Sequence, residues 1–158
     1  MKLAEALQER ADLNRSIAQL KSRLEASALV QQGEQPLEDP VQLKQSLDSA
    51  IQRLAWLIAR INHTNCITQA EGRTLTEWIA QKDALTLQIQ LYREILQEAS
   101  QANYRARGTE IRILPTISVP SWQAELDDLC RQLRLLDNLL QKTNWETDLL
   151  EGPLPTTL

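Results

Sequence analysis

The residues that could support metal or nucleophilic chemistry are few in this chain. It has one histidine, His63, and two cysteines, Cys66 and Cys130. His63 and Cys66 are three positions apart and could share one face of a helical turn, but zinc needs three or four protein ligands and no second pair has suitable spacing. A cysteine–histidine nucleophile would require a cysteine to meet His63, and Cys130 lies on an apolar helix face, where it should pack as a small core residue.

Two further patterns give no catalytic signal. Asp127 and Asp128 are adjacent, so on a helix their side chains point in different directions and make a poor acid–base pair. The sequence has no glycine-rich phosphate loop and no Glu-x-x-His motif of the di-iron bundle type. We therefore expect no catalytic residue, no metal ligand and no cofactor. The residue types favour a non-enzymatic role and leave an enzymatic one as an alternative.

Polar side chains are expected to gather at one end of the fold. Arg10 and Lys82 occupy positions where the spacing of their helices predicts an apolar residue, so each must pair, reach solvent or displace the apolar stripe. One interpretation is a buried polar network or a pocket for an anionic group. The other, favoured by the usual behaviour of polar residues at helix ends, is a set of caps and solvated side chains. The candidate ligand-binding residues are Arg10, Asn62, Asn65, Arg73, Lys82 and Asn144.

Apolar residues at alternating steps of three and four predict four long helices that would position these residues. Asp39 and Pro40 are a strong start signal, because aspartate caps a helix and proline is tolerated at its first position. Thr74 and Glu77 fit a capping box. The predicted helices cover about 3–29, 40–61, 74 to the region 103–108, and 121 onward, with a polar loop at 62–73.

Four long helices with short connections favour a mainly α fold, an up-down-up-down antiparallel four-helix bundle. The composition agrees, because the apolar residues are mostly Leu, Ile and Ala, and only 4% of residues are aromatic. We expect a single helical-bundle domain over residues 1–150. Residues 151–158, with two prolines and two threonines, should form a flexible C-terminal tail.

Residues 109–119 have a different pattern. Aliphatic and polar residues alternate there, which is typical of a half-buried strand, and Pro115 restricts that strand to an edge or a turn. The segment should form a short β hairpin or a single strand between the third and fourth helices. Either form needs a partner for its backbone groups, so we expect a homo-oligomer with an interface at Ile111, Ile113, Ile117 and Val119.

Charge and composition narrow the class of partner and the location. The formal net charge is −4, with 17 basic and 21 acidic residues and no basic run, so we expect no nucleic-acid partner. Mixed charges on the polar helix faces disfavour a membrane partner, and no apolar run approaches the ~20 residues that span a bilayer. The charged first residues do not resemble a signal peptide, and two distant cysteines suit the reducing cytoplasm.

Several local motifs together resemble a small family of uncharacterised bacterial helical proteins, some of which carry the label septicolysin. The motifs are Met1-Lys2-Leu3-Ala4-Glu5-Ala6-Leu7, Ile61-Asn62 with Thr64-Asn65, Gly72-Arg73-Thr74-Leu75, Glu110-Ile111-Arg112 and Asn144-Trp145-Glu146-Thr147-Asp148-Leu149. They span nearly the whole chain. The resemblance implies a cytosolic bacterial protein without established biochemistry, and it marks Asn62, Asn65, Arg73 and Asn144 as family-like.

The preferred interpretation is a non-enzymatic cytoplasmic helical bundle that acts as an oligomeric scaffold or interaction protein. The alternative is a small-ligand-binding protein or an enzyme that uses the polar cluster. A membrane-active, cytolysin-like protein ranks third.

Overall fold

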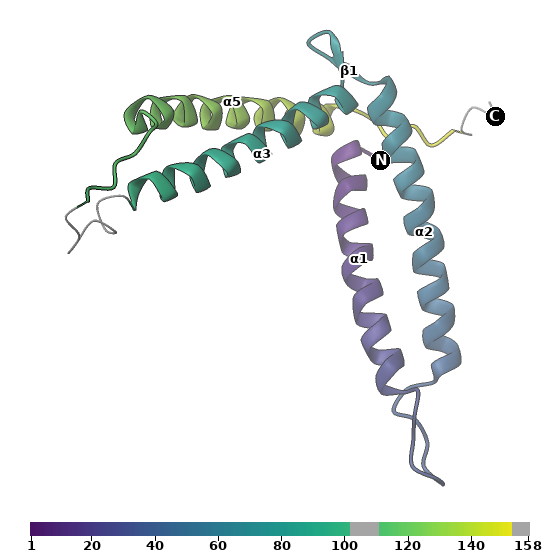
Figure 1. Cartoon of the computed structure of the whole chain (residues 1–158). Coiled ribbons are helices and arrows are strands. Elements are labelled where there is room, and N and C mark those ends of the chain that lie inside the picture. The colour runs from purple at the N-terminus through teal and green to yellow at the C-terminus, as the bar shows by residue number, and fades with distance from the viewer. Residues whose placement is uncertain (102–110, 153–158) are drawn as a thin grey trace, which may run out of the picture. The chain divides into compact units, whose positions relative to one another are not determined.

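The computed structural model describes residues 1–101 and 111–152, and it is mainly α as predicted. Four long helices account for most of the described chain (Figure 1). Two very short strands lie between the second and third of them. The elements are α1 (Leu3–Ala26), α2 (Pro40–Ile67), β1 (Gln69–Ala70), β2 (Arg73–Thr74), α3 (Leu75–Ser100) and α5 (Val119–Glu146).

The predicted starts of α2 and α3 are confirmed by their caps. The Val41 amide donates to the carboxylate of Asp39 at 2.9 Å, and Pro40 takes the first helical position. At α3, the Thr74 amide donates to Glu77 Oε2 at 2.7 Å, while the Glu77 amide donates to Thr74 Oγ1 at 3.2 Å. These bonds satisfy amide groups that the first helical turn leaves without partners.

α2 is longer than predicted, because it ends at Ile67 rather than near Ile61. Residues 62–65 are polar, but they include neither proline nor glycine, so nothing in the backbone stops the helix. The inward face also continues through this turn, since Thr64 is fully buried. Its hydroxyl donates to the Arg60 carbonyl and accepts from the Leu150 amide, so the buried oxygen is satisfied within the helical structure.

The hairpin joins α2 to α3, and its predicted position between the third and fourth helices is wrong. β1 and β2 are antiparallel, with Gln69 opposite Thr74 and Ala70 opposite Arg73. Between them, Glu71 and Gly72 have φ values of 49° and 82°. Positive φ at both central residues is what a two-residue type I′ hairpin requires.

Residues 111–118 form no strand, and Val119 begins α5; Thr109 and Glu110 lie outside the described residues. The alternation of aliphatic and polar residues in this segment is compatible with a strand. A strand also needs a neighbouring strand to complete its backbone hydrogen bonds. Pro115 lacks an amide proton to give such a neighbour. Among the described residues, the two-stranded sheet at 69–74 offers no third partner.

The chain separates into two compact units, each described here by itself. Among the described residues, unit 1 comprises residues 1–68 and 143–152, and unit 2 comprises residues 69–101 and 111–142. In unit 1, α1 and α2 run antiparallel, and Glu9 pairs with Arg53 across them. In unit 2, α3 and α5 run antiparallel, and Lys82 pairs with Asp137. The predicted antiparallel pairing of consecutive helices is therefore confirmed within each unit.

Each helical pair has its own apolar core. In unit 1 the buried apolar residues are Leu3, Ala6, Leu20, Leu43, Leu57, Ile61 and Leu149. In unit 2 they are Leu75, Leu85, Ile89, Leu96, Leu126, Leu129, Leu136 and Leu140. The single domain over residues 1–150 and the flexible tail over 151–158 stay predictions.

Unit 1 is closed by a bridge between segments far apart in sequence, which we call the terminal bridge (residues 1–3 with 147–150). The Leu3 amide donates to the Thr147 carbonyl at 2.9 Å, and the Leu149 amide donates to the Met1 carbonyl at 2.9 Å. Lys2 Nζ lies 2.8 Å from a carboxylate oxygen of Asp148. Leu149 is thereby held in the core of the α1–α2 pair.

Candidate functional site

The six residues of the predicted polar cluster are divided between the two units. Arg10, Asn62, Asn65 and Asn144 belong to unit 1, and no hydrogen bond or ion pair joins them to one another among the residues described. Asn62 is exposed, and the other three are half-buried. Their role as a ligand-binding group stays a prediction.

The two members in unit 2 already have partners within that unit. The Arg73 guanidinium carbon lies 5.1 Å from the centre of the Trp78 ring, a cation–π contact. Lys82 Nζ lies 2.6 Å from Asp137 Oδ1 on α5. Lys82 therefore occupies its stripe position by pairing at the edge of the core, where both side chains keep contact with water.

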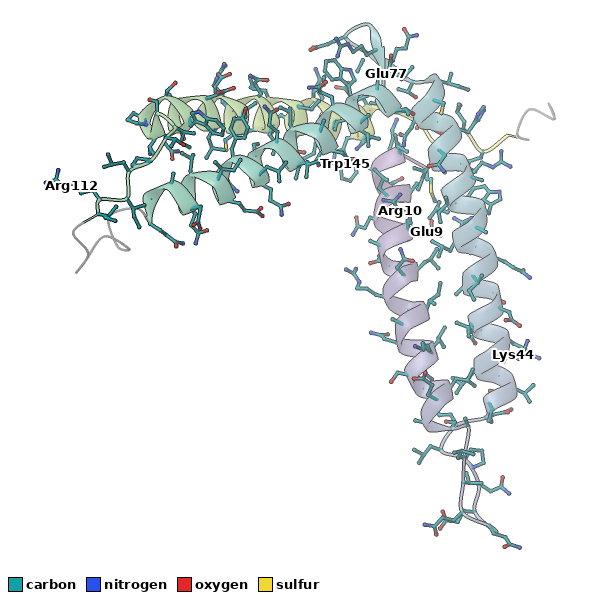
Figure 2. All side chains as sticks on the ribbon, in the orientation of Figure 1. Glu9, Arg10, Lys44, Glu77, Arg112 and Trp145 are labelled. Atoms are coloured by element: carbon teal, nitrogen blue, oxygen red, sulfur yellow. The ribbon has the colours of Figure 1, made fainter. Side chains whose placement is uncertain are left out.

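An arginine–tryptophan cluster in unit 1 was not predicted from the sequence. Arg53 donates two hydrogen bonds to the Glu9 carboxylate, at 2.6 and 2.9 Å. The Arg53 and Arg60 guanidinium carbons lie 4.5 and 5.6 Å from the centre of the Trp56 ring. The positions 53, 56 and 60, three and four residues apart on one helix, are the signal that could have indicated it. Figure 2 shows Glu9 beside Arg10 on α1.

The electrostatics of this cluster point to a structural role. The hydrogen bonds from Arg53 lower the pKa of the Glu9 carboxyl against the opposing effect of burial, and the same bonds raise the pKa of Arg53. Both groups therefore stay charged through the physiological range. Arg60 donates to the Gly152 carbonyl. Glu9 therefore neutralises the Arg53 charge within the fold, while Arg60 adds a second cation to the cluster.

A groove in unit 2 combines a thiol with charged side chains. It lies between α3 and α5 and has a volume of about 780 Å³. Cys130 is half-buried in its wall rather than packed in the core as expected, and Arg93 Nη2 lies 3.6 Å from its sulfur. Within residues 1–101 and 111–152, no three His, Cys, Asp or Glu side chains converge as metal ligands would.

The outward side of α3 carries a second apolar stripe that the sequence pattern had not revealed. We call it the outer stripe; it runs opposite the buried face formed by Leu85, Ile89 and Leu96. Its three large members, Leu87, Leu91 and Ile95, are 55%, 46% and 42% exposed. A helix that is apolar on two sides usually has a partner on each. The outer stripe consists of Ala80, Ala84, Leu87, Leu91 and Ile95.

The segment after α3 adds more exposed aliphatic surface. Ile111 is 81% exposed, Leu114 is 70% exposed and Ile113 is 44% exposed. Ile113 to Ile117 line a shallow groove with Ile95 and Ala99 of α3. Of the predicted interface residues, Ile111 and Ile113 are therefore accessible, whereas Ile117 and Val119 are half-buried.

These observations define a mainly α protein built from antiparallel helical pairs. The chain belongs to a family of unknown function, DUF6847, whose model matches residues 10–149. It is also similar to the crystal structure of a functionally unknown conserved protein from Corynebacterium diphtheriae, with a TM-score of 0.90 and 33% sequence identity. That match covers 95% of this chain and 99% of the other. No curated protein matches the sequence.

The predicted resemblance to an uncharacterised bacterial helical family is thus confirmed. Neither description contains the septicolysin label, so no cytolytic activity follows from the comparisons. None of the helices described here has an apolar stretch of the length needed to cross a membrane.

Proposed function

We propose that the protein is a non-enzymatic, cytoplasmic interaction protein that assembles into homo-oligomers through the segment following α3. The observation that carries this proposal is the exposure of Ile111, Ile113 and Leu114 on one short segment beside α3. Three large aliphatic side chains within four positions make an apolar patch of the kind that marks a contact surface.

Packing these side chains against a second copy would remove apolar surface from water. That removal favours association by roughly 25 cal/mol for each Å² buried. Arg112 and Thr116 are exposed and separate the aliphatic residues along the segment, so they can stay hydrated at the edge of such a contact. Pro115 prevents a regular strand ladder. The contact is therefore made by side chains, with Ile111 and Ile113 contributing more than the half-buried Ile117 and Val119.

Other features support an interaction role over chemistry at the polar cluster. Arg73 and Lys82 are engaged within unit 2, and Arg53 is neutralised by Glu9. Neither Cys66 nor Cys130 forms a disulfide, which agrees with a reducing compartment.

Light scattering coupled to size-exclusion chromatography tests the assembly. The wild-type mass should be a multiple of the 18.0 kDa of one chain. Ile111→Glu should shift the distribution toward the monomer, because a carboxylate is costly to bury in an apolar contact. Thr116→Glu is the matched control, since it adds the same charge to an exposed position of the same segment and should leave the mass unchanged.

A wild-type protein that stays monomeric at every concentration would contradict the proposal, as would an Ile111→Glu variant with the wild-type mass. Melting shifts with small anions that depend on Arg10 or Asn65 would instead favour the ligand-binding alternative.

A further inference from the structure

The outer stripe of α3 has charged neighbours of one sign only. Acidic residues lie within or beside it along its whole length, and all of them are exposed. The two basic residues of α3 lie on the other side of the helix: Lys82 pairs with Asp137, and Arg93 lies near Cys130. The acidic neighbours are Glu77, Asp83, Glu94 and Glu98.

We propose that the outer stripe binds an amphipathic helix of a partner protein whose apolar residues are flanked by lysine or arginine. The inference rests on the proposed function of the chain as an interaction protein and names the chemistry of a partner. Apolar stripes on two helices supply the contact area, and the charges beside the stripes select which helices pair. The carboxylates of Asp83 and Glu94 lie beside the stripe, and α3 itself places no lysine or arginine on this face, so the local charge favours a basic partner.

The same charges argue against a second copy of α3 in this position. Two identical outer stripes packed together, in either direction, would bring acidic side chains of both copies alongside one another. Like charges beside a helix interface oppose pairing. The stripe adjoins the oligomer contact proposed at Ile111 and Ile113, because Ile95 also lines the groove beside Ile113, but its acidic neighbours favour a different occupant.

The shape of the stripe also specifies the partner. Ala80 to Ile95 spans roughly 22 Å at about 1.5 Å per residue, so a partner helix of about four turns covers it. Its N-terminal part is shallow, with Ala80 and Ala84, and its C-terminal part is raised by the larger Leu87, Leu91 and Ile95. A complementary helix places large apolar residues opposite the alanines and small ones opposite the leucines and the isoleucine.

Fluorescence anisotropy with synthetic peptides tests the proposal on the full chain. The probes are three labelled peptides of roughly 20 residues, long enough to form helix. The first has a Leu/Ala stripe flanked by Lys, the second has the same stripe flanked by Glu, and the third is a scrambled form of the first. The Lys-flanked peptide should bind at least about tenfold more tightly than the others, and its binding should weaken with added salt.

Two double variants locate the binding. Leu87→Gln with Leu91→Gln should weaken the Lys-flanked peptide about tenfold or more without adding charge, and Asp83→Asn with Glu94→Gln should reduce both affinity and salt dependence. Leu135→Gln is the matched control, because Leu135 lies on α5 and is 55% exposed, as is Leu87; it should bind like the wild type. Circular dichroism checks that each variant keeps its helical content.

Equal binding of the Lys-flanked and scrambled peptides would overturn the proposal, as would binding that survives the double leucine replacement. It would also fall if that replacement abolished self-association while no peptide bound, since the stripe would then join copies of the chain. The wild-type mass tests the oligomer separately: a monomer that still binds the Lys-flanked peptide keeps this inference and removes the assembly.

Discussion

Thr64 illustrates how a single buried hydroxyl connects two distant parts of unit 1. Its side chain is fully buried, and Oγ1 donates to the Arg60 carbonyl at 2.8 Å. The same oxygen accepts a hydrogen bond from the Leu150 amide at 3.0 Å. A polar atom is stable in that position only while both bonds are formed. Thr64 therefore both permits α2 to continue and holds residue 150 against it.

Thr64→Val should lower the free energy of unfolding by about 1–3 kcal/mol. The variant keeps the shape of the side chain but leaves the Leu150 amide without its acceptor. Thr86→Val on α3 is the control, because Thr86 makes the same 2.8 Å bond to the carbonyl four residues earlier but is exposed. Urea denaturation followed by circular dichroism gives both values. Equal stability of the two variants would show that the Leu150 bond contributes nothing.

At the scale of elements, helix periodicity and caps are sufficient to predict the four helices. They are not sufficient to predict every surface of α3. Apolar spacing predicts the inward stripe of α3 but not its outer stripe, because the prediction assigns a single apolar face to each helix. The strand predicted for residues 109–119 does not form over residues 111–118, because strand formation depends on a partner elsewhere, which local alternation does not reveal. The hairpin at 69–74 was missed because its strands are only two residues each, too short for any periodic signal.

The turn of that hairpin allows a prediction that depends on backbone conformation alone. Gly72 has a φ of 82°, and a Cβ placed there would meet no atom within 4 Å. Gly72→Ala should therefore destabilise the protein by about 1–2 kcal/mol, through the cost of the left-handed conformation rather than through a clash. Glu71→Asn should stabilise it slightly, because asparagine tolerates the φ of 49° better than glutamate.

Thermal denaturation of the two turn variants beside the wild type provides the measurement. An unchanged melting temperature for Gly72→Ala would mean that the turn relaxes without cost. A lower melting temperature for Glu71→Asn would contradict the assigned turn conformation.

At the scale of the whole molecule, unit 1 is assembled from both ends of the sequence, and residues 69–142 form unit 2 between them. Which helices pack together cannot be predicted from periodicity, because periodicity reports on each helix by itself. The polar cluster stays a prediction, since it depends on how the ends of different helices are arranged. The motifs near residues 1–7 and 144–149, noted for their resemblance to a family, turn out to pair in the terminal bridge.

The terminal bridge should contribute to stability through its buried side chain more than through its charges. Leu149 is 5% exposed and its neighbour Leu150 is 40% exposed, so the two leucines form a matched pair on one segment. Leu149→Ala should cost about 2–5 kcal/mol by removing buried methyl groups from the unit 1 core, whereas Leu150→Ala should cost clearly less. The exposed pair of Lys2 with Asp148 is worth at most about 1 kcal/mol, so Asp148→Asn should change little. Urea denaturation of the three variants measures their free energies of unfolding. If Asp148→Asn lost as much stability as Leu149→Ala, the ion pair and not the burial of Leu149 would hold the two ends together.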